Sequence, residues 1–230
     1  MPEPVASTPD RSHDLRQRPR AILFDWDNTL VDNWTAIHDA LNATLAAMER
    51  PAWSLAETRA RVRASLRDSL PAMFGEGWRE AEQIFFRRFS ETHLGGLSPM
   101  PGAAIMLKAA AAKGLYLGVV SNKHGHFLRL EAERLGWTPL FGRVVGSGDA
   151  PQDKPAVDPV DLALRDSGIA RGADVWFIGD ADIDMTCACN AGCMPILLRT
   201  VAPETDQFAG GAPAGWVPNC AALAALIDQL

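Results

Sequence analysis

Residues 21–30 read AILFDWDNTL, an apolar run that changes abruptly into a polar segment with two aspartates. Continuous rather than alternating apolarity indicates a strand buried on both faces, as in a parallel sheet covered by helices. Asp25 and Asp27 follow this strand directly. Ligands of open parallel sheets bind in the crevice beyond the carboxyl ends of the strands. The segment therefore predicts a class of fold and also the place where its polar chemistry is concentrated.

Similar apolar runs recur along the chain. YLGVV, RVVGS, VWFIG and PILL occupy residues 116–120, 143–147, 175–179 and 195–198. Helical patterns with their own boundary signals lie between them, such as the one that opens after Pro101 and Gly102 and ends at Gly114. This alternation predicts an α/β fold, a doubly wound parallel sheet with helices on both faces.

One long segment interrupts the alternation, because three helical patterns follow one another with no strand between them. The second of these patterns begins with Ser54 and Glu57 in the positions of a capping box. All three carry apolar residues at helical spacing, which predicts amphipathic helices. The predicted helices cover residues 34–48, 54–70 and 78–95.

The length of 230 residues and the hydrophobic content of 47% allow one large domain or a core with a modest insertion. We predict an inserted helical lid, or cap, at residues 33–97, because the strands resume only after it. The core then consists of residues 19–32 and 98–230, and residues 1–18 form a disordered tail.

Composition narrows the choice of partners and location. A formal net charge of −6 gives no general attraction to nucleic acid, whose binding depends on many Lys and Arg contacts to phosphate. No apolar run approaches the roughly 20 residues that cross a bilayer, and the first residues show no signal-peptide pattern. We therefore expect a cytoplasmic protein without nucleic-acid or membrane partners, either a monomer or a weak homodimer. The four cysteines are expected to be free thiols, three of them packed in a helix at 187–193 as small hydrophobes.

The aspartates after the first strand suit phosphoryl transfer. Asp25 is the predicted nucleophile, attacking phosphorus in line to form an aspartyl phosphate. Asp27 is the predicted general acid and base, which protonates the departing alkoxide and later deprotonates the attacking water. The competing interpretation is that DWDNT, at 25–29, is only a turn rich in Asp and Asn.

A second acidic pair, Asp180 and Asp184 in GDADID, again follows an apolar strand. Carboxylates gathered around a phosphate repel by roughly 4 kcal/mol per pair at about 4 Å, so the crevice needs a cation. Mg²⁺ is the expected one, because it is a hard ion that binds oxygen ligands. We predict Asp25, Asp180 and the backbone carbonyl of Asp27 as ligands, with Asp184 binding through water or orienting Asp180.

Two further segments of the sequence carry polar groups near the ends of predicted strands. Ser121 and Asn122 end the run at 116–120, and their side chains and backbone N–H groups can bind phosphate oxygens. Lys154 lies before Pro155, where an ammonium in a stiffened loop can balance both Asp25 and the transferring phosphoryl group. A simple turn and an unpaired surface lysine are the alternatives. Together with the acids, these segments predict a phosphatase.

Four segments now carry candidate site residues: Asp25 with Asp27, Ser121, Lys154, and Asp180 with Asp184. In their order and spacing they resemble the four motifs of the haloacid dehalogenase superfamily over residues 20–200. The resemblance implies that Asp25, Asp27, Lys154, Asp180 and Asp184 are catalytic or metal-binding, and that Thr29, Ser121 and Asn122 bind phosphate together with Lys154. It also implies that the helical insert is a cap of the first type, and that Asp27 excludes the dehalogenase branch. Trp26 and Asn28 differ from the residues more common in the first motif.

Lys123 and the DKPAVDP segment are similar to phosphoglycolate phosphatases, which makes 2-phosphoglycolate the expected substrate among small phosphorylated metabolites. A phosphomutase with the same nucleophile and a catalytically silent protein that binds phosphorylated ligands are the alternatives. The cap offers several cationic or titratable side chains as candidate contacts for an anionic substrate group, and we expect most of them to lie on solvated helix faces. They are Arg59, Arg61, Arg63, Arg67, Arg87, Arg88 and His93.

Overall fold

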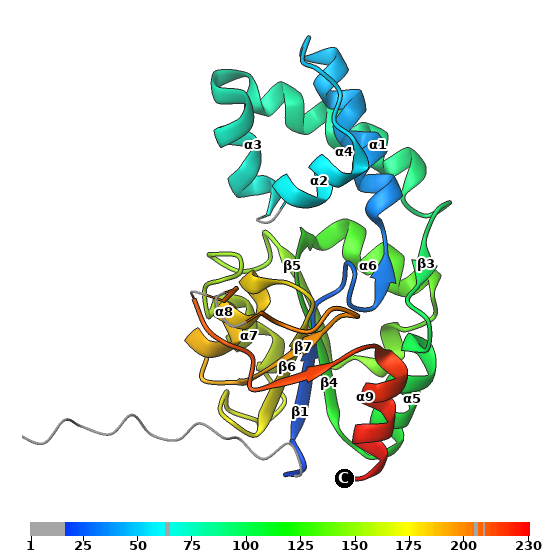
Figure 1. The fold of residues 1–230 in the computed structure, drawn as a ribbon, viewed down its shortest axis with the longest axis vertical. Coiled ribbons are helices and arrows are strands. Elements are labelled where there is room, and N and C mark those ends of the chain that lie inside the picture. Colours follow the sequence, from blue (N-terminus) through cyan, green and yellow to red (C-terminus); the bar gives the residue numbers. More distant parts are fainter. Residues whose placement is uncertain (1–16, 63–64, 205–206, 209) are drawn as a thin grey trace, which may run out of the picture.

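The computed structural model describes residues 17–62, 65–204, 207–208 and 210–230. Apart from Gln17 and Arg18, the predicted tail at residues 1–18 therefore lies outside the described residues. None of the helices in these ranges combines the length and apolarity that crossing a membrane requires. The described chain is an α/β core with a helical insert above it (Figure 1).

Six strands form the central sheet in the order β5-β4-β1-β6-β7-β8, and all neighbours are parallel. The strands are β1 (Ala21–Phe24), β4 (Tyr116–His124), β5 (Arg143–Ser147), β6 (Val175–Gly179), β7 (Met194–Leu198) and β8 (Gly215–Val217). The chain builds β4 and β5 on one side of β1 and then crosses to β6 on the other side. This reversal of strand order opens a crevice beyond the carboxyl end of β1. All five predicted strands are confirmed, and β8 is additional.

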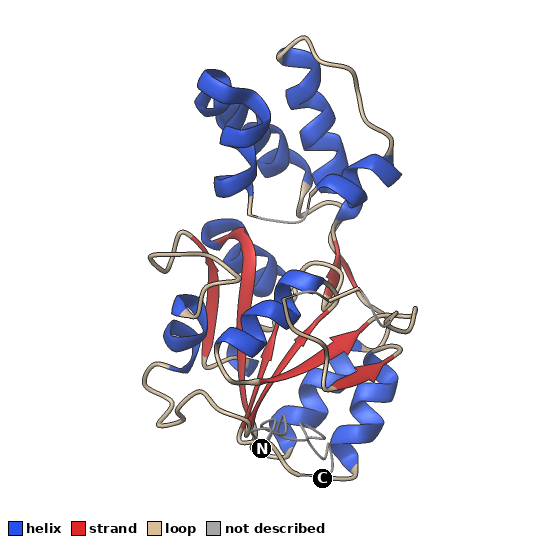
Figure 2. Ribbon diagram, turned by 60° about the vertical axis from the view of Figure 1, so that its left-hand side comes forward, coloured by secondary structure: helices blue, strands red, loops and turns tan. Residues whose placement is uncertain are grey.

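Helices cover both faces of this sheet (Figure 2). Ile22 and Phe24 of β1 pack in one apolar cluster with residues of three helices, and Ala21 and Leu23 pack in a second cluster with residues of two others. The helices of the first face are α5 (Ala103–Ala112), α6 (Gly125–Arg134) and α9 (Cys220–Asp228), with a short 3₁₀ turn, η2 (Thr138–Leu140), after α6; those of the second are α7 (Asp158–Leu164) and α8 (Asp182–Asn190). The predicted doubly wound fold is confirmed, because successive residues of β1 are buried on opposite faces.

The insert stands over the carboxyl ends of the strands (Figure 1). It consists of α1 (Trp34–Ala47), α2 (Leu55–Arg61), α3 (Leu66–Phe74), the 3₁₀ turn η1 (Gly75–Gly77) and α4 (Trp78–Thr92). Two short strands, β2 (Val31–Asp32) and β3 (Ser98–Pro99), connect it to the core and pair antiparallel. Its helices have an apolar core of their own, which Phe127 of α6 joins from below. The insert is therefore a small cap domain held by two adjacent connections.

The prediction of one continuous helix at residues 54–70 is wrong. Its start is confirmed, since Glu57 N donates to Ser54 Oγ (3.2 Å) and Ser54 N donates to Glu57 Oε2 (2.8 Å). A second cap of the same kind follows, however, in which Asp68 N donates to Ser65 Oγ (3.3 Å). A serine cap satisfies the free N–H groups of a new helix start, so α3 begins there as a separate helix.

Candidate active site

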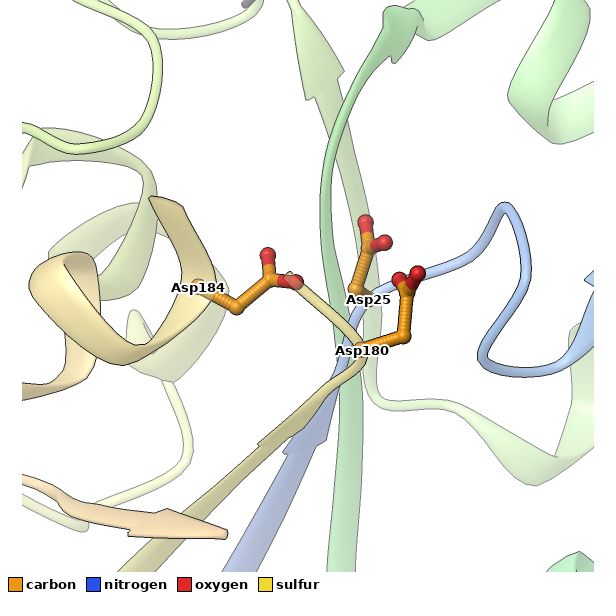
Figure 3. Close-up of side chains that lie close together, drawn as sticks. All are labelled: Asp25, Asp180 and Asp184. Carbon is orange, nitrogen blue, oxygen red and sulfur yellow. The ribbon is translucent and has the colours of Figure 1, made fainter. Parts of the chain in front are cut away.

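Three carboxylates meet beyond the ends of β1 and β6 (Figure 3). Asp25 follows β1, Asp180 follows β6, and Asp184 lies in the first turn of α8. One carboxylate oxygen from each lies within 4.8 Å of the others. Asp25 N donates to Ile178 O of the neighbouring strand (2.8 Å), which holds the two strand ends in register. The structure thus brings together side chains that are more than 150 positions apart in the chain.

Lys154 reaches this acidic cluster from the loop between β5 and α7. Its Nζ donates to Asp25 Oδ1 and to Asp184 Oδ1, both at 2.7 Å, and the side chain is 2% exposed. Asn122 holds the backbone of Lys154 at both ends, since Asn122 Oδ1 accepts from Lys154 N (3.0 Å) and Asn122 Nδ2 donates to Lys154 O (3.2 Å). The predicted phosphate ligand Asn122 is therefore also the residue that positions the lysine.

Charge in this cluster is not balanced by Lys154 alone. Burial raises the pKa of Asp25 to about 6, with Lys154 opposing the rise and Asp184 adding to it. Burial, and then the charges of Asp184 and Asp25, raise the pKa of Asp180 well above its usual value. Burial by itself would lower the pKa of Lys154, but Asp184 and Asp25 raise it. Three oxygen ligands with excess negative charge fit a hard divalent cation.

Two predicted phosphate-binding hydroxyls occupy different positions. Ser121 lines the cavity beside Asp25, and its Oγ accepts from Lys123 N (3.2 Å). Thr29 is fully buried outside the cavity lining, and its Oγ1 donates to Asp180 Oδ1 at 3.4 Å. The structure thus places the hydroxyl of Thr29 next to a candidate metal ligand.

A family model described as haloacid dehalogenase-like hydrolase matches residues 22–198. The chain belongs to this family. It is 32% identical over 202 residues to a phosphoglycolate phosphatase of Shigella boydii serotype 4 (strain Sb227), covering 76% of this chain and 79% of that protein. A phosphoglycolate phosphatase of Rhodospirillum rubrum is 33% identical over 204 residues, 83% of each chain.

Solved structures agree on the fold of this haloacid dehalogenase-like hydrolase. The crystal structure of a predicted phosphoglycolate phosphatase from Haemophilus somnus 129PT superposes with a TM-score of 0.77 at 21% identity, covering 89% of this chain and 96% of that one. Together, the family match and the curated relatives identify this hydrolase as a phosphatase resembling phosphoglycolate phosphatases.

Asp27 of the phosphatase lies at the rim of the cluster with a side chain 20% exposed. Its Oδ1 accepts from Lys123 Nζ (2.8 Å) and from Asn33 Nδ2 (3.0 Å). The turn that carries it places Asn28 at φ 62°, a left-handed conformation that Asn tolerates better than most residues. The departure of Asn28 from the common first motif therefore suits the backbone of the turn.

A cavity of about 540 Å³ extends from the acidic cluster to the cap of the phosphatase. Asp25, Asp27 and Lys154 line its floor, while Trp34 and Phe86 belong to its cap-side wall. The cavity holds the predicted catalytic residues and a partly apolar space above them, as a small-molecule site requires.

The basic residues of the cap have diverse positions. Arg59 and Arg67 line the cavity, whereas Arg61 pairs with Glu57 (3.2 Å). Arg88 pairs with Asp39 (2.7 Å) and His93 is buried below the cap. Arg63 lies outside the described residues and Arg87 outside the cavity lining. Of the six candidate contacts that lie in the described part of the chain, Arg59 and Arg67 line the site.

Glu131 and Asn33 lie behind Asp27 and were not among the predicted site residues. Asn33 precedes α1 but makes no side-chain cap bond; its Nδ2 donates instead to Asp27 Oδ1 and to Glu131 Oε2 (2.9 Å). Glu131 is fully buried on α6, on the helix face that also buries Leu128 and Ala132. A carboxylate at an apolar position of an amphipathic helix was the available signal.

Proposed function

We propose that this protein is a Mg²⁺-dependent phosphomonoesterase that works through an aspartyl-phosphate intermediate. The observation that carries the proposal is the convergence of Asp25, Asp180 and Asp184 within 4.8 Å, with Lys154 Nζ 2.7 Å from Asp25. Hydrolysis of phosphate esters is very slow without a catalyst, so it needs a positioned nucleophile and dense charge compensation. This cluster offers both.

The first half-reaction forms the intermediate. An oxygen of Asp25 attacks phosphorus, the bond from phosphorus to the ester oxygen breaks, and Asp27 gives its proton to the departing alkoxide. Lys154, already bonded to Asp25 Oδ1, compensates charge on the carboxylate and on the transferring group. Ser121 and Asn122, both in the cavity lining, are proposed to bind the phosphate oxygens.

The second half-reaction restores the enzyme. Asp27, now a carboxylate, takes a proton from water, and the resulting oxygen attacks phosphorus of the aspartyl phosphate. The bond from phosphorus to Asp25 breaks, which releases inorganic phosphate and a free carboxylate. Each proton and each bond is accounted for, since Asp27 ends protonated as it began. The cap excludes bulk water during the first step.

Asp25, Asp180 and the backbone carbonyl of Asp27 are the proposed ligands of the ion, with Asp184 supporting them. Asp184 Oδ2 accepts from Ala181 N (3.1 Å) and Oδ1 accepts from Lys154 Nζ, so its orientation is already fixed. Mg²⁺ bound there supplies charge neutralisation and Lewis-acid polarisation of the phosphoryl oxygens. Thr29 is proposed to act by orienting Asp180 and not by contacting phosphate directly.

The proposed substrate is a small phosphorylated metabolite, with 2-phosphoglycolate first. This choice is supported by the relatives that are 32% and 33% identical to this chain, both of which are named phosphoglycolate phosphatases. Arg59 and Arg67 on the cavity wall are the candidate contacts for a substrate carboxylate. We also propose a cytoplasmic location, with which the four free cysteines agree, since thiols persist in reducing compartments.

Release of inorganic phosphate from a panel of phosphorylated metabolites, with and without Mg²⁺, tests the proposal. We expect Mg²⁺-dependent release by the wild type and none above background by Asp25→Asn. Thr44→Val is the matched control, because Thr44 is fully buried in the cap and its hydroxyl bonds only Ala40 O (2.8 Å). Transfer of phosphate to another position of the substrate, without release, would instead indicate a phosphomutase. Equal inactivity of wild type and Asp25→Asn would leave a phospholigand-binding protein.

A further inference from the structure

Glu131 is a fully buried carboxylate in which both oxygens are used. Oε2 accepts from Trp26 Nε1 (2.7 Å) and from Asn33 Nδ2 (2.9 Å). Oε1 lies 2.9 Å from His93 Nδ1 and 3.2 Å from Lys123 Nζ. These five residues form what we call the Glu131 cluster. A buried charge with four donors around it is held in one orientation.

Two members of the Glu131 cluster lie at the two connections between the cap and the core. Asn33 directly precedes α1, where the chain enters the cap, and His93 directly follows α4, where it leaves. The connections lie side by side, since Val31 of β2 pairs with Pro99 of β3. A core carboxylate therefore bonds to both ends of the cap.

The same cluster reaches the proposed acid and base. Lys123 Nζ and Asn33 Nδ2 both donate to Asp27 Oδ1, at 2.8 and 3.0 Å. Among the described residues Oδ2 of Asp27 has no partner, while the carboxyl group lines the cavity. Asn33 donates to both carboxylates although its own Oδ1 is buried without a partner. The Asn33 amide is thus oriented by the two bonds that its Nδ2 donates, to Asp27 and Glu131, and not by a bond to its Oδ1.

We propose that Glu131 is a positioning residue for proton transfer by Asp27. In this role it also couples the orientation of the Asp27 carboxyl group to the two connections of the cap. Through Lys123 and Asn33 it holds Oδ1 of Asp27, which leaves Oδ2 to face the ester oxygen. Through His93 and Asn33 it makes that orientation depend on how the two cap connections lie. Glu131 is outside the cavity lining and does not touch substrate. This inference rests on the proposed function of Asp27.

The chemical state of Glu131 agrees with this role. Burial by itself would raise the pKa of Glu131, but the bonds from His93 and Trp26 and the charge of Lys123 lower it below its usual value. Lys123 remains an ammonium, because Asp27 and Glu131 raise its pKa against the effect of burial. The cluster is therefore held by charge-assisted bonds, which are shorter and stronger than neutral ones.

The test compares two esters that differ in their need for an acid. An aryl phosphate such as p-nitrophenyl phosphate has a leaving group that departs as a stable phenolate, whereas an alkyl phosphate needs a proton at the leaving oxygen. The quantity measured is kcat/KM, which covers the steps up to departure of that group. Glu131→Gln keeps the size of the side chain but turns one acceptor oxygen into an amide that cannot accept these bonds.

We expect Glu131→Gln to lower kcat/KM by about 10- to 100-fold for the alkyl ester and at most about threefold for the aryl ester. Asp27→Asn should show the same selectivity with a larger loss, and Thr44→Val should change neither. If Glu131→Gln does not fold, Asn33→Ala provides a comparison of the same kind with a smaller expected loss, because it removes one of the two links between Glu131 and Asp27 and leaves the one through Lys123.

Equal losses on both esters, or no loss, would overturn the inference and leave the Glu131 cluster a structural network. That outcome differs from failure of the proposed function. If the wild type hydrolysed neither ester with Mg²⁺ present, the phosphatase proposal would fail. If Asp27→Asn lost activity equally on both, the assignment of Asp27 as acid would fail.

Discussion

Two buried lysines each pair with one of the two aspartates that follow β1, and the surroundings of these lysines differ in charge. Lys154 lies 2.7 Å from both Asp25 and Asp184, with Asp180 nearby, so one ammonium faces three carboxylates. Lys123 lies 2.8 Å from Asp27 and 3.2 Å from Glu131, and other donors complete the bonds of Glu131. The first cluster carries excess negative charge and the second is saturated with donors.

The pKa shifts follow this difference. Burial raises the pKa of Asp25 to about 6 and raises that of Asp180, while bonds from the Glu131 cluster lower the pKa of Glu131 despite its burial. A cluster with raised acid pKa values gains most from an added cation. A saturated cluster has no such need and instead holds its members in place. We propose that the first cluster holds the reacting groups and that the second orients them.

Replacing Asp25, the proposed nucleophile, is the most severe way to break the first cluster. Asp25→Asn should lower Mg²⁺-dependent phosphate release by about 10³-fold or more, since loss of a nucleophile removes the covalent pathway. The variant should remain folded, because Lys154 keeps its bond to Asp184. Steady-state phosphate release checks the first expectation, and a chemical denaturation curve checks the second. Activity within tenfold of the wild type would show that Asp25 is not the nucleophile.

Removing each lysine in turn compares the two clusters directly. Lys154→Met and Lys123→Met should each lower the free energy of unfolding by about 3–5 kcal/mol without metal, because each leaves buried carboxylates without their cation. Saturating Mg²⁺ should restore much of the loss in Lys154→Met, where it supplies charge to the same acids. It should not do so in Lys123→Met, because the side-chain carboxylates next to Lys123, those of Asp27 and Glu131, are not proposed ligands of the ion.

The measurement is urea denaturation of both variants with and without Mg²⁺, with the wild type as reference. A similar Mg²⁺-induced gain in Lys154→Met and Lys123→Met would contradict the distinction between the clusters.

Stability against pH separates the clusters without using activity. Because the pKa of Asp25 is raised from its usual 3.8 to about 6, the folded protein keeps a proton that the unfolded chain has lost in this window. Stability of the metal-free wild type therefore falls as pH rises from about 4 to about 6, and the full penalty remains above it. Asp25→Asn should be more stable than the wild type at about pH 8, by up to about 3 kcal/mol.

Denaturation curves of both proteins in chelator, at several pH values, provide the check. If Asp25→Asn were less stable than the wild type throughout, the first cluster would be balanced and the comparison wrong.

Thr29→Val should have the smallest effect. The hydroxyl of Thr29 donates to Asp180 Oδ1 at 3.4 Å, a long bond that orients a proposed metal ligand. We expect Mg²⁺ to bind about three- to tenfold more weakly, with KM for substrate little changed, since such outer contacts tune metal ligands. Activity measured against Mg²⁺ concentration tests this. A raised KM for substrate at saturating Mg²⁺ would indicate that Thr29 binds phosphate after all.

The strands of the core and the acids after them were predictable because both leave strong local signals. AILF at 21–24 is buried at every residue, and continuous apolarity is what such a strand requires. The short strand β8, with only Gly215–Val217, has too few residues for a periodic pattern. The break between α2 and α3 escaped prediction because the apolar spacing continues across the cap at Ser65.

The Glu131 cluster shows a different limit. Three of its members, Trp26, Asn33 and His93, lie 105, 98 and 38 positions from Glu131 in the chain, so no local pattern joins them to it. His93 was one of several cap residues named as candidate contacts for an anionic substrate group. Tertiary packing instead buries it against Glu131. Partners brought together only by the fold cannot be inferred from spacing.

The most direct test of the account is the identity of the phosphorylated residue. The enzyme is mixed with substrate and Mg²⁺, quenched within one turnover, digested and analysed by mass spectrometry. We predict one added phosphoryl group on Asp25, absent without Mg²⁺. With p-nitrophenyl phosphate, whose leaving group needs no acid, the group should accumulate in Asp27→Asn, because this variant cannot deprotonate the attacking water. Rapid phosphate release with no phosphorylated Asp25 at any time, or with the group on another residue, would contradict the assignment of Asp25 as the nucleophile.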